Sequence, residues 1–292
     1  MIRVRYAPSP TGSLHVGGVR TLLFNWLFAH QQKGTLVLRV EDTDRARSTQ
    51  ESERSVLEDI EALGLRYDEG PFRQSERLNI YAEYVRQLIR SNAAFPCFCS
   101  TDRIAEKRSV AMKLGRPPHY DGTCAHLSPT EIQERVRQGQ KAGWRFRAPQ
   151  KTYGLDDLVR GHVEFREGSV GDFLITRSPS PSDPPAAPLF PTDTVPPDTL
   201  EPVEDYGLGI GMPVYNFSCV VDDHLMGMTH VIRGEDHLSN TARQLMLYEA
   251  FAWQPPQFAH LAMVLGADKQ KLSKRNGDVS TRDYLGKGYL CE

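Results

Sequence analysis

The chain has 292 residues, enough for one large domain or two to three smaller ones. Hydrophobic residues make up 39% and charged residues 25%, a globular profile that excludes collagen-like, coiled-coil and wholly disordered chains. No apolar run approaches the roughly 20 residues that a bilayer span needs, so we expect no membrane segment. An odd number of cysteines and the absence of a signal-peptide core indicate a cytoplasmic protein, or one of an organelle matrix if a presequence is missing.

Charge and proline are concentrated in one segment. Residues 178–211 contain six acids and no Lys or Arg, and without them the net charge would change from −2 to +4. A mildly basic body is compatible with a nucleic-acid partner. Nine prolines between 178 and 203 prevent a helix or a sheet ladder there. We expect a disordered insertion at 178–211 rather than a linker between domains, because strand-like sequence resumes on both sides.

The first forty residues predict a strand, a glycine-containing loop, a helix and a second strand. Residues 2–6 alternate as a short buried strand, and apolar residues recur at helical spacing between 19 and 27. Residues 35–40 (TLVLRV) form the second strand. A β-α-β opening of this size favours a parallel sheet with crossover helices.

The later elements alternate between helical and strand patterns. Amphipathic helices are predicted at 51–63 and 78–91, and a cysteine-containing segment follows at 95–126. The remaining expectations are a helical stretch near 129–142, β-rich sequence at 144–174, strand-like sequence from 212, a helix around 241–251 and a strand at 260–265.

The segment SPTGSLHVGG, residues 9–18, stands where the first strand turns into the first helix. Glycines let backbone amides approach a ligand closely, and a helix N-terminus favours phosphate. Thr11 and His15 are hydrogen-bond donors suited to the same anion. By itself, the segment is explained equally well as a loop that joins a strand to a helix.

A second segment, QKLSKR at 270–275, forms a basic loop after the last predicted strand. Lys271 and Lys274 are suited to clamping a polyphosphate and neutralising charge on a pyrophosphate leaving group. A lone segment of this kind is most simply a solvated basic loop. The two segments in this order are far more informative than either alone.

Together they resemble the two signatures of class I aminoacyl-tRNA synthetases, usually written HIGH and KMSKS, which stand here as HVGG and KLSKR. The stretches RYAPSPTGSLHVGGVRTLLFNWLFA, LRVEDTDRARS, YNFSCVVDDHLMGMTHVIRGEDHLSNT and KLSKRNGDVSTRDYLGKGYL resemble the glutamyl-tRNA synthetase family in particular. The resemblance covers nearly all of the chain outside the proline-rich segment. It implies an α/β fold, a Rossmann-like nucleotide-binding domain split by an α+β insertion domain that binds the tRNA acceptor stem.

The resemblance also implies domain boundaries. We expect the first half of the Rossmann-like domain at 1–80, the insertion domain at 81–177, the proline-rich insertion at 178–211, the second half at 212–265, and the KLSKR loop with the start of a stem-contact fold at 266–292. Members of the family continue into a helical anticodon-binding domain. The chain is therefore expected to be a catalytic portion, either a fragment or a natural truncation.

Glutamate offers two carboxylates and one ammonium, so its recognition needs guanidinium groups and a carboxylate. Arg5 and Arg233 are suitably placed cations, and Glu41, with Ser9 helping, is a candidate for the ammonium. Each charged residue alone would be explained equally well by a structural ion pair. The family resemblance assigns these positions, together with Tyr215, to glutamate binding.

The resemblance further implies ATP-dependent activation of L-glutamate and transfer to the 3′ end of tRNA(Glu), with Mg²⁺ bound to the phosphates. His15 and Lys274 would stabilise the transition state, with Lys271 supporting. The implied ATP-binding residues are Thr11, His15, Gly17, Gly18, Asp236, Lys271 and Lys274. Acids at 42, 44, 222 and 223 are interpreted as ion-pair partners rather than metal ligands, because the phosphates hold the magnesium in this family.

The cysteines at 97, 99 and 124 are followed by His126 in a CxC–CxH pattern. Three thiolates (Cys97, Cys99, Cys124) and an imidazole can close a tetrahedral structural zinc site. Some glutamyl-tRNA synthetases have such a pattern in the insertion domain. Tyr120 is the alternative fourth ligand, because Tyr-x₃-Cys resembles the pattern of glutamyl-queuosine tRNA synthetases. Buried free cysteines are the remaining alternative.

Two other functions stay open. A glutamyl-queuosine tRNA(Asp) synthetase is favoured by the length of the chain and by Tyr120, but HVGGVRTLLFNWLFA and KRNGDVSTRDYL resemble the full-length enzyme. A non-catalytic tRNA-binding fragment is disfavoured by the intact His15 and Lys274. The expected partners are the tRNA(Glu) acceptor stem, L-glutamate and ATP, bound by a monomer.

Overall fold

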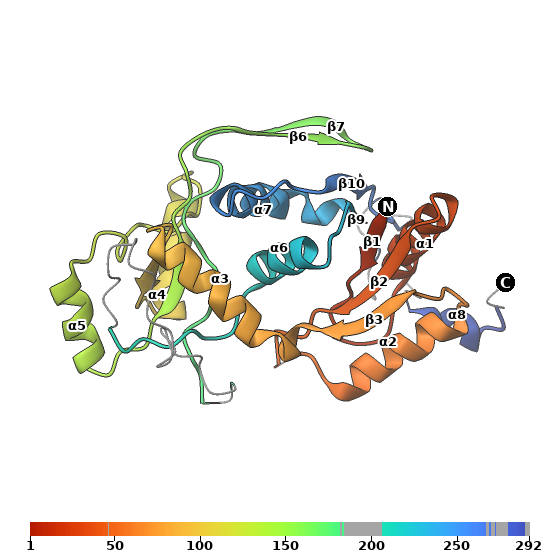
Figure 1. The fold of residues 1–292 in the computed structure, drawn as a ribbon, viewed down its shortest axis with the longest axis horizontal. Coiled ribbons are helices and arrows are strands. Elements are labelled where there is room, and N and C mark those ends of the chain that lie inside the picture. The colour runs from red at the N-terminus through yellow and green to blue at the C-terminus, as the bar shows by residue number, and fades with distance from the viewer. Residues whose placement is uncertain are drawn as a thin grey trace.

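A computed structural model describes residues 1–45, 47–181, 183, 206–266, 269, 272 and 280–289. Figure 1 shows the N-terminal elements at one end of the molecule, α6 and α7 in the middle, and α4 and α5 at the other end. Within the described ranges, no helix combines the length and hydropathy required to span a membrane.

The N-terminal part forms a three-stranded parallel sheet with the order β1-β2-β3. Its elements are β1 (Arg3–Tyr6), α1 (Val16–Gln31), β2 (Thr35–Val40), α2 (Gln50–Ala62) and β3 (Glu69–Arg73). The predicted strands at 2–6 and 35–40 and the helix at 51–63 are confirmed to within a residue. Strand β3 was not predicted, because Gly70 and Pro71 interrupt its strand pattern.

The second part forms a two-stranded parallel sheet of its own. Its elements are α6 (Tyr215–Leu225), β9 (His230–Gly234), the short η2 (Glu235–His237), α7 (Leu238–Ala250) and β10 (Gln257–Leu261). β9 pairs with β10 and lies beside β1, where the N–H of Thr229 donates to the carbonyl of Arg3 at 2.9 Å. The strands lie in the spatial order β3-β2-β1-β9-β10, which is that of a doubly wound nucleotide-binding fold. The direction in which successive strands are added reverses between β1 and β9.

The strand-like sequence expected from 212 is instead the helix α6. Residues 217–223 are buried at every consecutive position, polar Ser218 and Asp222 included, so no apolar stripe with a 3.6-residue period remains. A short buried run rich in Val and aromatic residues then resembles a strand. The last strand also lies earlier than expected, at 257–261 rather than 260–265.

The middle of the chain forms a separate antiparallel sheet, β4-β5-β8, and a hairpin, β6-β7. Its elements are η1 (Gln74–Glu76), α3 (Leu78–Arg90), β4 (Ala94–Cys97), α4 (Thr101–Lys113), α5 (Pro129–Arg137), β5 (Gly143–Phe146), β6 (Tyr153–Asp157), β7 (Gly161–Phe165) and β8 (Phe173–Leu174). Helix α4 was not predicted, because none of its residues is buried and no apolar stripe marks it. The helix near 129–142 is confirmed but ends at Arg137.

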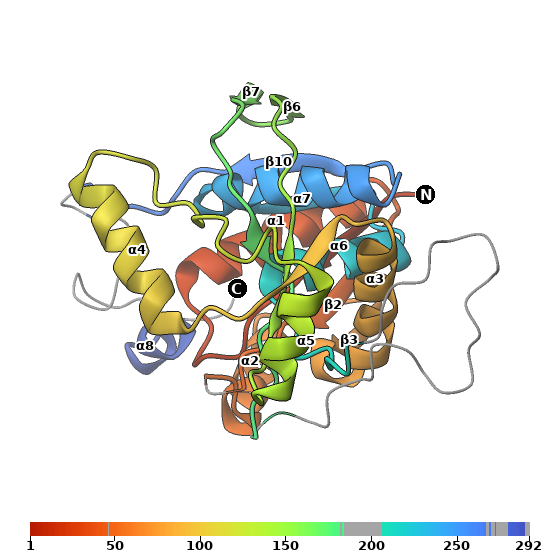
Figure 2. The same ribbon diagram turned by 90° about the vertical axis from the view of Figure 1, so that its left-hand side faces the viewer.

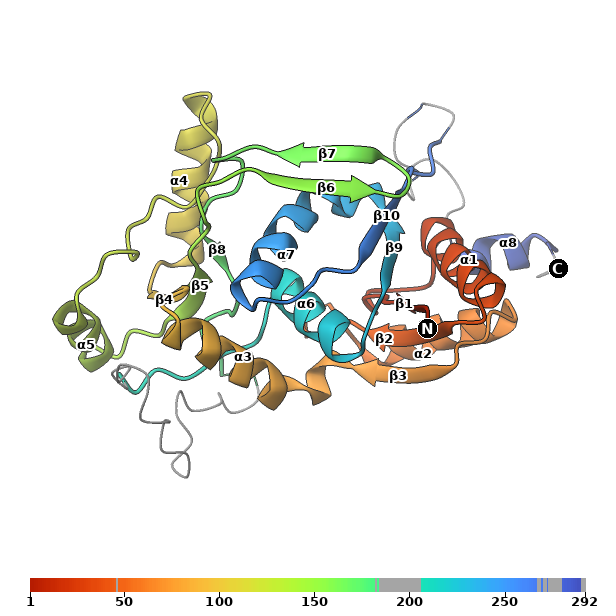
Figure 3. The same ribbon diagram turned by 45° about the horizontal axis from the view of Figure 1, so that its top comes forward.

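The β6-β7 hairpin leaves the antiparallel sheet and passes over α7 to reach β10, as Figures 2 and 3 show. At its tip, the N–H of Leu158 donates to the carbonyl of Phe258 at 2.9 Å. The hairpin therefore connects the middle of the chain to the outer edge of the parallel sheet.

The proline-rich segment leaves and re-enters the fold at one place, because the N–H of Arg177 donates to the carbonyl of Met212 at 2.8 Å. The prediction of disorder at 178–211 falls mostly on residues outside the described ranges. Near the end of the described residues lies the short helix α8 (Thr281–Gly286). The predicted domain boundaries at 80, 177 and 265 stay predictions.

Candidate active site

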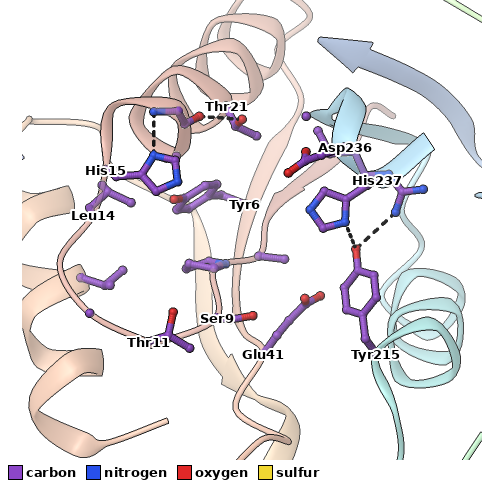
Figure 4. Close-up of a pocket in the computed structure, with 18 of the residues that line it drawn as sticks. Tyr6, Ser9, Thr11, Leu14, His15, Thr21, Glu41, Tyr215, Asp236 and His237 are labelled. Atoms are coloured by element: carbon purple, nitrogen blue, oxygen red, sulfur yellow. Dashed lines mark hydrogen bonds between the residues drawn. The ribbon is translucent and has the colours of Figure 1, made fainter. Parts of the chain in front are cut away.

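A cavity of about 840 Å³ opens where the carboxyl ends of β1, β2 and β9 meet. In doubly wound sheets this reversal of strand order is the place where ligands bind. The sequence-predicted residues that line it are Arg5, Ser9, Thr11, His15, Gly17, Gly18, Glu41, Tyr215, Arg233 and Asp236. Figure 4 shows His15 on one side of the cavity and Tyr215 and His237 on the other. Lys271 and Lys274, also predicted here, lie outside the described residues.

His15 caps the N-terminus of α1. Its Nδ1 accepts a hydrogen bond from the N–H of Gly17 at 2.9 Å, so the neutral ring carries its proton on Nε2. A Cβ on Gly17 would lie 2.6 Å from Cε1 of His15, and one on Gly18 would lie 2.9 Å from the Tyr6 hydroxyl. A side chain at either position would therefore displace the side chain that it meets. The arrangement places a helix N-terminus and an imidazole N–H beside the cavity, which suits phosphate.

The loop before His15 is fixed by distant residues. The backbone N–H and the hydroxyl of Thr281 both donate to the carbonyl of Leu14, at 2.9 and 2.7 Å. On its other side, the N–H of Leu14 donates to the Asp59 carboxylate at 3.0 Å. Ser280 forms an isolated antiparallel bridge with His15. The loop is therefore held between α2 and the start of α8.

Arg5 belongs to a buried network of charges at the base of the cavity. Its Nε donates to Asp223 at 3.1 Å, and Nη1 of Arg39 donates to the same carboxylate oxygen at 2.7 Å. Burial opposes ionisation of Asp223, but the two guanidinium groups lower its pKa to about 2. Arg39 also donates to Glu41 at 3.1 Å. Burial raises the pKa of Glu41 despite the nearby Arg39 and Arg5.

The neighbouring Asp222 is also fully buried and accepts hydrogen bonds from Gln74, Arg77 and Tyr81, at 2.9, 2.8 and 2.7 Å. The acids at 222 and 223 are thus ion-pair partners, as the sequence analysis expected. Of the other two acids, Asp44 pairs with Arg47, whereas Asp42 accepts hydrogen bonds from Ser75.

Arg233 is buried in β9 and has only uncharged partners among the described residues. Its Nη2 donates to Thr241 and Gln244 at 2.8 Å each, and its Nη1 donates to the Tyr215 hydroxyl at 3.4 Å. Its Nε donates to Nε2 of His260 at 3.1 Å. A buried guanidinium without a carboxylate partner is costly unless an anion is supplied. The site therefore suits the carboxylate of a ligand.

His237 lines the cavity but was missed by the sequence analysis. Its Nδ1 lies 3.2 Å from the Tyr215 hydroxyl. Burial and the positive charge of Arg233 lower the pKa of His237 to about 4, so the ring is neutral at pH 7. Its place directly after Asp236, at the end of a strand, was the only available signal.

The cysteine sulfurs at 97, 99 and 124 lie within 4.8 Å of one another. The Cys99 and Cys124 sulfurs are 3.7 Å apart, and the Tyr120 hydroxyl lies 3.5 and 3.4 Å from Cys97 and Cys99. Zinc with Zn–S bonds of about 2.3 Å holds its sulfurs about 3.8 Å apart, so this donor set fits zinc.

The structure does not bring His126 into this group, contrary to the first-choice ligand set. Ala125 is buried and its carbonyl accepts a hydrogen bond from Arg147 at 2.9 Å, whereas His126 is exposed. The Tyr120 ring lies inward instead, with the Arg145 guanidinium 3.8 Å from its centroid. Tyr120 is therefore the fourth side chain of the cluster.

Several known proteins are similar to the chain. The family of "tRNA synthetases class I (E and Q), catalytic domain" matches residues 1–181 and 209–292. Glutamate–tRNA ligase 2 of Thermoanaerobacter pseudethanolicus is 45% identical over 293 residues, which cover 100% of this chain and 54% of that protein. The glutamate–tRNA ligase of Coprothermobacter proteolyticus is 42% identical, with 100% and 56% covered.

A solved structure shares the fold. The crystal structure of a glutamate tRNA ligase from Elizabethkingia meningosepticum, in complex with its amino acid, matches with a TM-score of 0.80 at 31% identity. The match covers 100% of this chain and 59% of that one. The chain thus spans a little over half of the length of these relatives.

Proposed function

The chain belongs to the family of class I tRNA synthetases for glutamate and glutamine, and from that premise we propose that it activates L-glutamate with ATP and transfers it to the 3′ end of tRNA(Glu). The observation that carries the proposal is Arg233, a buried guanidinium with uncharged partners at the edge of the cavity. An anionic side chain supplies the charge that this site lacks.

The positions of the cations orient the substrate. Tyr215, whose hydroxyl accepts a hydrogen bond from Arg233, lies across the cavity from His15 and the N-terminus of α1 (Figure 4). We place the side-chain carboxylate of glutamate at Arg233 and Arg5, and its ammonium at Glu41 and Ser9. The α-carboxylate then faces the side of the cavity that suits phosphate.

Activation needs positioning and charge neutralisation rather than a protein nucleophile. An oxygen of the α-carboxylate attacks the α-phosphorus of ATP, and a new P–O bond forms. The bond to the bridging oxygen breaks, and pyrophosphate leaves with the electron pair. His15 Nε2–H and the positive end of the α1 dipole neutralise charge on the phosphates. Mg²⁺ bound to the phosphates would neutralise more, and Lys271 and Lys274 remain predicted contributors.

The cysteine cluster supports a structural role for zinc. Cys97, Cys99, Cys124 and Tyr120 would hold the ion and tie the end of β4 to the segment after α4. We also propose that this part of the chain contacts the acceptor stem of the tRNA, and that the protein acts as a monomer.

One observation favours a second candidate, a glutamyl-queuosine tRNA(Asp) synthetase. The Tyr120 hydroxyl lies among the cysteine sulfurs, where the sequence resembles that enzyme. Both candidates require the same activation of glutamate. They differ in the tRNA atom that receives it.

The deciding experiment offers ATP and labelled glutamate with purified tRNA(Glu) or queuosine-containing tRNA(Asp). An ester at the 3′ end of tRNA(Glu) is the expected product. Glutamate linked to the base of tRNA(Asp) would instead identify the second candidate. If the folded protein made neither product and showed no tRNA-dependent ATP–pyrophosphate exchange at high enzyme concentration, the proposed function would be wrong.

A further inference from the structure

Asp157, His260 and Arg233 form a buried hydrogen-bonded chain that ends at the cavity. The Asp157 Oδ2 lies 2.6 Å from Nδ1 of His260, and the His260 Nε2 lies 3.1 Å from Nε of Arg233. All three residues are buried, and His260 is 0% exposed. Asp157 ends β6 in the middle of the chain, whereas His260 and Arg233 belong to the paired strands β10 and β9.

The two hydrogen bonds on either side of His260 fix its tautomer. A guanidinium Nε–H only donates, so the Nε2 of His260 must accept. The carboxylate of Asp157 only accepts when ionised, so the Nδ1 of His260 carries the proton. Burial opposes ionisation of Asp157, but hydrogen bonds from the His260 side chain and from three backbone amides, those of Val159, Arg160 and His260, lower its pKa. Burial and Arg233 lower the pKa of His260, so its ring is neutral.

We propose that Asp157 and His260 are positioning residues that hold the Arg233 guanidinium in the orientation that receives the substrate's side-chain carboxylate. The proposal rests on the proposed function, in which Arg233 binds glutamate. It makes the β6-β7 hairpin, which contributes no residue to the lining of the cavity among the described residues, a determinant of amino-acid selectivity.

The docking of the hairpin supports this role. Besides Asp157, the hairpin tip is attached through the N–H of Leu158 to Phe258 and through Arg160 to Glu235. Glu235 follows β9 directly, and its carboxylate accepts a hydrogen bond from the N–H of Met263 at 2.8 Å. The hairpin is therefore attached next to β9 and β10, the strands that carry Arg233 and His260, and its position sets the position of Asp157.

The hairpin also provides a matched control. Asp156 and His162 form a second carboxylate–imidazole pair at 2.7 Å, but their side chains are 91% and 65% exposed. Asp156 precedes Asp157 in the same strand and points to the opposite face. This pair shares the chemistry and the element with Asp157–His260 but has no connection to Arg233.

The experiment compares two substitutions of His260 in ATP–pyrophosphate exchange with tRNA present. His260→Gln can keep an acceptor for Arg233, whereas His260→Asn can keep only a donor for Asp157. We expect His260→Asn and Asp157→Asn to raise the KM for glutamate about tenfold, the loss of one hydrogen bond, with the KM for ATP nearly unchanged. The discrimination of glutamate from glutamine should fall with them, and His260→Gln should recover most of both.

The controls Asp156→Asn and His162→Gln should match the wild type. Equal effects of His260→Gln and His260→Asn, or a KM for ATP that rises as much as that for glutamate, would overturn the positioning role. Absence of glutamate-dependent exchange in the wild type would overturn the proposed function itself.

An NMR measurement of the imidazole nitrogens in the unsubstituted protein needs neither activity nor a variant. It should show His260 neutral with the proton on Nδ1. The other tautomer, or an imidazolium at pH 7, would overturn the inferred chain even if every variant failed to fold.

Discussion

Arg5 and Asp223 form a buried ion pair, with Nε 3.1 Å from Oδ1, although the two residues are 218 positions apart in the sequence. The pair joins the first strand to α6, and Asp223 accepts from Arg39 as well. The orientation of Arg5 at the base of the cavity thus depends on a helix from the second part of the chain.

Removing the charge of Asp223 should destabilise the fold. Asp223→Asn leaves two buried guanidinium groups without their shared partner, which is expected to cost about 3–5 kcal/mol in the free energy of unfolding. Denaturant unfolding measures this change. The exposed pair of Glu58 and Arg282 is the control, and Glu58→Gln should cost at most about 1 kcal/mol. Equal costs for the two variants would contradict the importance of the buried pair.

The neutral His237 predicts how stability changes in mild acid. Its pKa is about 4 in the folded protein, against about 6.5 when unfolded, so the unfolded chain binds more protons between these values. Its contribution is complete above pH 6.5 and is lost as the pH falls toward 4, by about 3 kcal/mol. His237→Gln should flatten the stability curve in this window. Parallel curves for the variant and the wild type would contradict the expectation.

Arg233 should be irreplaceable by lysine. Arg233→Lys keeps the charge but loses the fork that reaches Thr241, Gln244 and Tyr215 together. We expect the KM for glutamate to rise about 100-fold, while the KM for ATP changes little. Arg243→Lys, on the neighbouring helix α7, should leave both constants unchanged. A variant at 233 with wild-type KM for glutamate would remove the main support for the proposed function.

A methyl group at position 17 should displace the His15 ring. In Gly17→Ala the new Cβ would lie 2.6 Å from Cε1 of His15, so the imidazole must move from its capping position. We expect the rate of pyrophosphate exchange to fall by about 10- to 100-fold, with a small change in stability. Gly286→Ala, where a Cβ meets no atom within 4 Å, is the control and should behave as the wild type.

Zinc binding should depend on Tyr120 rather than His126. Tyr120→Phe removes a hydroxyl that lies 3.4 Å from the Cys99 sulfur, so zinc affinity should fall at least about tenfold. His126→Ala changes an exposed side chain and should leave the affinity unchanged. Competition with a chromophoric chelator measures both. If His126→Ala lowered the zinc affinity and Tyr120→Phe did not, His126 would be the fourth ligand.

Local signals predicted the residues that stand at strand ends. Arg5 lies near the end of one apolar strand pattern and Glu41 directly follows another. The family resemblance then gave them roles, so their convergence on one cavity could be expected. Arg39, with no exposed surface, resembled an ordinary strand residue, because sequence alone does not show that Asp223 is nearby.

Long-range contacts explain what the sequence could not predict. Asp157 and His260 are 103 residues apart and belong to different sheets, so no spacing rule connects them. The choice between Tyr120 and His126 depended on the fold of the segment after α4. Tyr120 precedes Cys124 and His126 follows it, and only one of them can be the fourth ligand. Helix α6 was wrongly predicted as a strand because the burial of every residue from 217 to 223 removed the period that identifies a helix.

The two hydrogen bonds from Thr281 to Leu14 join positions 267 residues apart. The glycine-rich segment at 9–18 therefore does not determine its own conformation. The first 80 residues transplanted alone would carry the motif, the strands and the helix, but not the residue that holds the carbonyl before His15. The conformation of this motif is encoded at both ends of the described chain, and transferring it to another protein means transferring both.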